Sequence, residues 1–168
     1  MSRFRRGTLA VVVACVLAAC GGSKGVDLGV AEIDDAVTAV TAVIGKPVKF
    51  YEINATPDLI NLFAADGKGN ALNFVWEKGK LRDDSEAAPA DGVAFDASKM
   101  TFTNDVYAKV ATALPDSVLR AFAITADGPN GSVLYRVMIQ SQKGGQFAVL
   151  VDPTGKILGS DPLTGPTS

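Results

Sequence analysis

Residues 118–151 read VLRAFAITADGPNGSVLYRVMIQSQKGGQFAVLV, and this stretch decides the fold that the sequence predicts. It holds three apolar runs, at residues 118–126, 132–140 and 146–151. The segments between them, DGPNG and QKGG, are rich in Gly and Asn, which supply the positive φ angles that tight hairpin turns need. The stretch therefore predicts three antiparallel β-strands joined by hairpins.

The same order of elements occurs earlier in the chain. Three strand-like runs separated by turn residues lie at residues 48–53, 59–65 and 71–77. Each set of strands follows a segment whose apolar residues have helical spacing, residues 31–44 in the first copy and 103–114 in the second. The two predicted helices align at an offset of 70 residues, which places Asp35 on Asp105. The chain therefore contains an internal duplication.

The duplication predicts the fold class and the domain boundaries. We expect an α+β fold of two tandem αβββ(β) repeats, each a helix packed on an antiparallel sheet, because a helix laid on a sheet buries one face of it. The first repeat covers residues 26–82 and the second covers 93–160. The acidic, Ala- and Pro-rich residues 83–92 are predicted to be a linker, and residues 161–168 a disordered tail.

The N-terminus has the features of an export signal. Three arginines among the first six residues precede an apolar run from Leu9 to Ala19, which is too short to span a bilayer. Leu17-Ala18-Ala19-Cys20 resembles the lipobox of bacterial lipoproteins, in which the cysteine becomes the lipid-modified first residue. The resemblance implies a signal peptide at 1–19, and a lipidated Cys20 with a flexible tether at 20–25. It also implies a location on the extracytoplasmic side of the cell membrane, or at an outer membrane if the organism has one. The alternative is an ordinary secretory signal peptide.

Composition excludes several kinds of chemistry. The 168 residues include no His and two Cys, of which Cys15 lies in the predicted signal peptide and Cys20 would carry lipid. We therefore expect no catalytic triad, no metal site and no cofactor, and we predict that the protein is not an enzyme. Without the three N-terminal arginines, 13 basic residues face 18 acidic ones. This acidic balance argues against a nucleic-acid partner, since proteins that bind nucleic acids carry a basic patch.

The duplicated order of elements, over roughly residues 26–160, resembles a known group of envelope modules. Residues 95–114, FDASKMTFTNDVYAKVATAL, lead into a strand pair, and Gly155-Lys156-Ile157 ends the copy. This order is similar to tandem PepSY-like and beta-lactamase-inhibitor-like modules. The first copy departs from their pattern, because it lacks the Asp or Asn before its Gly79-Lys80-Leu81. The resemblance implies a non-catalytic module that binds or restrains another protein, often an envelope protein or a peptidase.

A set of apolar residues alternates away from the side of the strands that we expect the helices to cover. The set comprises Phe50, Ile60 and Leu62 in the first copy and Leu119, Leu134 and Met138 in the second. It predicts either a face on which the two copies pack together or a partner-binding face, because apolar patches of a few hundred Å² mark interaction sites. We expect a protein-binding or inhibitory accessory module. The alternative is a carrier of lipid or another small hydrophobic ligand.

Overall fold

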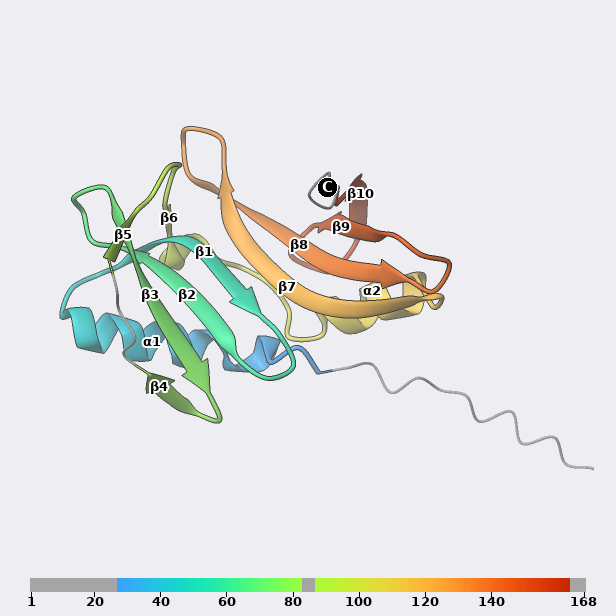
Figure 1. Ribbon diagram of the computed structural model, residues 1–168, viewed down its shortest axis with the longest axis horizontal. Coiled ribbons are helices and arrows are strands. Elements are labelled where there is room, and N and C mark those ends of the chain that lie inside the picture. The colour runs from blue at the N-terminus through green and yellow to red at the C-terminus, as the bar shows by residue number, and fades with distance from the viewer. Residues whose placement is uncertain (1–26, 83–86, 164–168) are drawn as a thin grey trace, which may run out of the picture.

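The computed structural model describes residues 27–82 and 87–163. The predicted signal peptide, Cys20 and the tether lie outside the described residues, as do residues 83–86 of the predicted linker and 164–168 of the predicted tail. The described residues form ten β-strands, two α-helices and two short 3-10 helices (Figure 1). In chain order these are η1 (Val30–Glu32), α1 (Ile33–Ile44), β1 (Lys49–Ala55), β2 (Ile60–Ala65), β3 (Asn70–Glu77), β4 (Lys80–Arg82), β5 (Ala87–Pro89), β6 (Phe95–Asp96), η2 (Ala97–Lys99), α2 (Val106–Ala113), β7 (Ser117–Asp127), β8 (Ser132–Ser141), β9 (Gln146–Val151) and β10 (Ile157–Pro162).

All ten strands belong to one antiparallel sheet. The strand order is β10-β9-β8-β7-β1-β2-β3-β4, with β5 paired to β3 and β6 paired to β1. The six strands predicted from alternation and turn residues are confirmed to within two residues at each end. Asp161 and Pro162 of the predicted tail belong to β10, and Ala87–Pro89 of the predicted linker form β5.

The predicted fold class, two αβββ(β) repeats that each form a helix on its own sheet, is wrong. Strand β1 pairs with β7, so that Ile53 lies between Leu62 of β2 and Ile124 of β7. This pairing fuses the strands of both copies into a single sheet, and only two α-helices accompany the ten strands in the described residues. The alternation within a strand fixes which residues share a face, but it does not say which distant strand will pair with it.

Both helices pack on the same side of the sheet and share one core (Figure 1). Helix α1 buries Ile33, Ala36 and Val40, which follow the three-to-four-residue spacing of one helix face, and it ends at Gly45 with φ 75°. Helix α2 is shorter than predicted. It ends before Leu114, whose φ of −126° and ψ of 65° are not helical, because Pro115 follows and disfavours the helical conformation.

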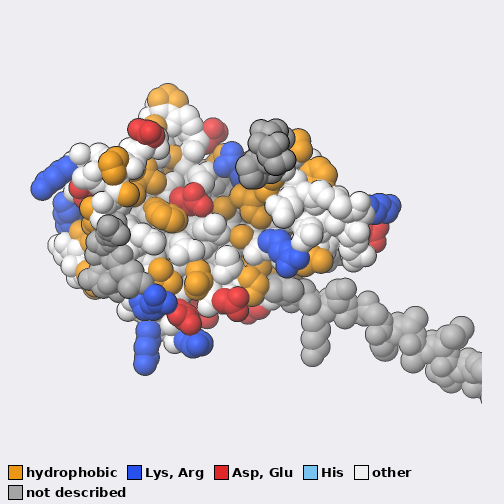
Figure 2. Space-filling model, viewed as in Figure 1, with side chains coloured by type: hydrophobic (Ala, Val, Ile, Leu, Met, Phe, Trp, Pro, Cys, Tyr) orange, Lys and Arg blue, Asp and Glu red, His pale blue; other side chains and the backbone are white. Residues whose placement is uncertain are grey.

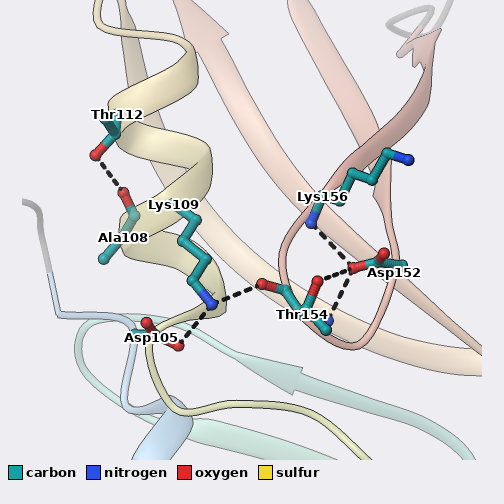
Figure 3. A network of polar contacts seen from close by, with 7 residues as sticks. All are labelled: Asp105, Ala108, Lys109, Thr112, Asp152, Thr154 and Lys156. Atoms are coloured by element: carbon teal, nitrogen blue, oxygen red, sulfur yellow. Dashed lines mark hydrogen bonds and ion pairs between the residues drawn. The ribbon is translucent and has the colours of Figure 1, made fainter.

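The tight turn between β9 and β10 lies against α2 (Figure 3). Asp152 Oδ1 accepts hydrogen bonds from the hydroxyl and N–H groups of Thr154 at 2.8 Å each and from the Lys156 N–H at 3.0 Å. These bonds, led by that from the Thr154 side chain, lower the pKa of the Asp152 carboxyl below its ordinary value of 3.8. Lys109 of α2 donates to the Thr154 carbonyl oxygen at 2.9 Å, which holds the helix against the turn.

Two phenylalanines before α2 connect the halves of the core. Phe95 is fully buried with its ring 6.3 Å from that of Phe50 in the first copy. Phe102 packs against Phe122 at 5.7 Å and Tyr135 at 6.0 Å in the second.

Candidate functional site

The face of the sheet opposite the helices is the candidate site, and we call it the open face. None of the described helices covers it, and Figure 2 shows it with hydrophobic side chains gathered over the middle of the sheet among a few charged groups. Cross-strand partners share a face, so the register assigns the residues. The open face carries Glu52, Asn54, Asn61, Phe63, Asn73, Val75, Ala121, Ala123, Thr125, Leu134, Arg136, Met138, Ala148 and Leu150.

Two of the six predicted face residues lie on the open face. Leu134 and Met138 of β8 are half-buried, and they alternate with Tyr135 and Val137, which point into the core. Met138 is flanked by Ala121 on β7 and Ala148 on β9. Both alanines are buried, with exposed fractions of 7% and 4%, so Met138 itself supplies the accessible apolar surface at this position.

The prediction is wrong for Phe50 and Leu119, which are buried on the helix side with exposed fractions of 0% and 5%. The cause is a β-bulge in the first strand of each copy. The register shifts between Phe50 and Glu52 in β1 and between Leu119 and Ala121 in β7. A bulge adds one residue to one strand, so the alternation changes phase across it.

The prediction is also wrong for Ile60 and Leu62, which are 2% and 0% exposed. Ile60 pairs with Trp76 and Leu62 with Phe74. Directly paired residues lie on the same face, so both residues join the core that Phe74 occupies. A one-residue difference in the assumed phase of this strand places its whole apolar set on the wrong side.

Polar side chains cross the middle of the open face. Arg136 donates to Thr125 Oγ1 at 2.9 Å, and the Asn54 amide donates to Glu52 Oε1 at 3.4 Å. The side-chain oxygens of Asn54 and Asn73 are buried and accept no hydrogen bond in the described structure. Because both oxygens are inaccessible to solvent, a ligand on the open face does not reach them unless the two side chains move.

The open face is hollowed at one end. A hollow of about 340 Å³ lies between the sheet and the segment that follows β5. Its lining residues are Tyr51, Glu52, Phe63, Ala71, Asp91, Gly92, Val93, Thr125 and Ala126. The sequence did not predict this hollow, because Asp91 and Gly92 were assigned to the linker and Val93 to the start of the second repeat. The Gly92 turn was the signal that could have indicated a fixed crossing of the chain.

The open face has few groups for covalent chemistry. Residues 27–82 and 87–163 contain no group of three or more His, Cys, Asp or Glu side chains that could hold a metal ion. The same residues contain no helix that is long and apolar enough to cross a membrane. The pKa values of Asp66, Asp96 and Asp152 are lowered by local hydrogen bonds; Asp66 and Asp152 lie in turns, and Asp96 ends β6 and caps η2. What the open face offers is apolar contact, hydrogen-bond acceptors and a hollow.

No protein-family model, curated protein or solved structure matches this chain. The similarity to PepSY-like and beta-lactamase-inhibitor-like modules therefore stays a prediction, as does the lipobox.

Proposed function

We propose that the chain is a lipid-anchored lipoprotein of the bacterial cell envelope, and that its folded part binds a partner protein through the open face without catalysing a reaction. The observation that carries this proposal is the uncovered face itself. Leu134, Met138 and Leu150 are half-buried there, and the charged side chains of Glu52 and Arg136 lie on the same face. A face with both apolar area and polar groups suits a protein surface, because protein interfaces combine the two.

The partner class follows from the predicted location. An anchored module at the extracytoplasmic side of the membrane meets other envelope proteins, and the resemblance to PepSY-like modules favours a peptidase or another envelope enzyme among them. The acidic balance of the chain beyond residue 6, 13 basic against 18 acidic residues, favours partners with a basic surface.

A charge-substitution experiment tests the binding face. We expect Leu134→Glu with Met138→Glu to leave the fold intact, as judged by Trp76 fluorescence, and to abolish recovery of crosslinked partner from native membranes. A matched control places glutamate at Val43, which is 57% exposed on α1, on the other side of the sheet. Equal partner recovery by both variants would contradict the proposal.

A second experiment tests the anchor. Cys20→Ser removes the thiol to which the acyl chains would be attached, so we expect the protein to move from the membrane fraction to the soluble fraction. Two acyl chains give stable anchoring where one is marginal. Membrane retention of the Cys20→Ser protein would contradict lipid anchoring at this residue.

The alternative function, carriage of lipid or a small hydrophobic ligand, requires an interior that side chains do not fill. The space between the helices and the sheet is occupied by fully buried side chains, among them Phe74, Phe122 and Ile33. This packing favours protein binding over carriage. Stoichiometric lipid in organic extracts of the native protein would reverse the order of the two proposals.

A further inference from the structure

The hollow on the open face is fixed in shape by the segment that crosses it. The Ala90 N–H donates to the Gly69 carbonyl oxygen at 3.0 Å, and β6 then pairs with Lys49 and Phe50 of β1. Gly131, in the turn after β7, lies so close to the Ala94 carbonyl that an added Cβ would be 3.0 Å from its oxygen. Contacts at both ends therefore hold Asp91 to Val93 above the sheet, and the hollow does not require a partner in order to form.

The charge of the lining is negative. Glu52 and Asp91 contribute carboxylates, and no described lining residue is basic. Arg136 lies on the same face, and its guanidinium donates to Thr125, one of the lining residues. The hollow thus has two acidic groups with one cation at its border, which favours a positively charged ligand and disfavours an anion.

Two aromatic rings supply the apolar part of the lining. Phe63 pairs directly with Glu52 across β1 and β2, and both residues line the hollow. Tyr51 is the extra residue at the bulge in β1 and also lines the hollow. A cation near an aromatic face is attracted by the ring quadrupole. The rings also provide contact area for an aliphatic stem.

The polar side chains of the lining suit a ligand with hydrogen-bond donors. Glu52 and Asp91 contribute carboxylate oxygens, which accept hydrogen bonds. An ammonium or guanidinium group carries several donors and no acceptor, which matches these oxygens.

We propose that this hollow binds an organic cation, namely a primary ammonium or guanidinium group on an apolar stem. The inference rests on the proposed binding function and names the chemical group that the open face recognises. A hollow of about 340 Å³ is at the small end of ligand pockets, which suits one lysine or arginine side chain or one small free amine.

Titration of the isotope-labelled protein, followed by backbone amide NMR shifts, tests the proposal. The probes are pentylammonium and its neutral match, 1-pentanol. We expect pentylammonium to cause saturable shifts at Phe63, Gly92 and Thr125, and 1-pentanol to bind at least about fivefold more weakly. Equal binding of the two probes would overturn the proposal.

Variants locate the site. We expect Asp91→Asn and Glu52→Gln each to weaken pentylammonium binding by about fivefold, and Arg136→Gln to strengthen it by removing a like charge. Glu52→Gln also affects Asn54, which donates to Glu52. Asp91 is exposed and makes no described side-chain hydrogen bond, so Asp91→Asn removes the charge without that side effect. The control is Asp34→Asn on α1, which makes the same charge change on the other side of the sheet. The proposal fails if Asp91→Asn behaves like the control.

Two further probes distinguish the sources of the cation. The peptide acetyl-Gly-Lys-Gly-amide represents a protein side chain, and cadaverine represents a free amine. Tighter binding of the peptide supports a partner's lysine, and tighter binding of cadaverine supports a small amine. Binding of neither would overturn the inference. It would leave the proposed function in place if Leu134→Glu with Met138→Glu still abolishes partner recovery.

Discussion

At the residue scale, the turn from Asp152 to Lys156 depends on one glycine. Gly155 has φ +87°, and a Cβ built there would lie 2.8 Å from the Val106 carbonyl oxygen of α2. The glycine thus combines a left-handed backbone with a close helix approach, and both requirements exclude a side chain. The Gly-Lys-aliphatic ending of the second copy was part of the resemblance to the envelope modules. The close contact with α2 is the physical reason for a glycine at its first position.

We therefore expect Gly155→Ala to lower the free energy of unfolding by about 2–4 kcal/mol, because strain and steric overlap add. Gly144→Ala is the matched control, since Gly144 has a similar φ of +94° with no heavy atom near the added Cβ. It should cost only about 1 kcal/mol. Chemical denaturation followed by Trp76 fluorescence measures both variants, and equal losses would show that the contact with Val106 is unimportant.

Three hydrogen-bonded carboxylates also affect the stability of the folded protein at acid pH. Hydrogen bonds lower the pKa values of Asp66, Asp96 and Asp152 in the folded state, led respectively by those from Asn70, from the Ser98 backbone and from Thr154. A lowered folded-state pKa contributes stability that is complete above the unfolded value and is lost as pH falls through the folded value.

We accordingly expect the stability that these groups contribute to be independent of pH near neutrality and to decline as pH falls below 3.8, the ordinary aspartate value. Asp152→Ala should be less stable than wild type at neutral pH and should lose less on acidification. Denaturation at a series of pH values checks this, and parallel pH profiles for the two proteins would contradict it.

At the scale of elements, the strands and their turns were predictable but their partners and faces were not. Alternation and turn residues are local, so they placed the strand that ends at Val151 correctly. The pairing of β1 with β7 and the bulges at Tyr51 and Arg120 depend on distant contacts, and they reversed the faces assigned to Phe50 and Leu119. The hollow went unpredicted for the same reason, since it forms only when Asp91 to Val93 cross the finished sheet.

Two leucines that sequence alternation placed on one face provide the test. Leu62 is fully buried among core residues and Leu134 is half-buried on the open face. We expect Leu62→Ala to cost about 2–5 kcal/mol of unfolding free energy and Leu134→Ala about 1 kcal/mol or less. Because the substitution is the same, the comparison reports burial directly. A loss at Leu134 as large as that at Leu62 would mean that another surface covers the open face.

At the scale of the whole molecule, one sheet and one core predict one cooperative unit. The core cluster includes Ile33 and Val40 of α1 together with Val106 and Val110 of α2. The pairing of β1 with β7 also carries backbone hydrogen bonds between the halves. The described part of the chain should therefore unfold as a single domain rather than as two repeats.

Two local probes can check this cooperativity. Trp76, the only tryptophan, reports on β3, and hydrogen exchange at Val137 reports on β8 in the other half. We expect the same unfolding free energy from both. A second half that opens at clearly lower free energy would support independent repeats and contradict the single sheet as a cooperative unit.

The central claim is that the open face binds a partner protein. Site-specific photo-crosslinking on native membranes tests it most directly, with the crosslinker placed at Met138 on the open face or at Val43 on α1. We expect one discrete adduct from Met138 and no such adduct from Val43. Added wild-type protein should compete for the Met138 adduct, whereas added protein with Leu134→Glu and Met138→Glu should not. The same adduct from Val43, or no competed adduct from Met138, would contradict it.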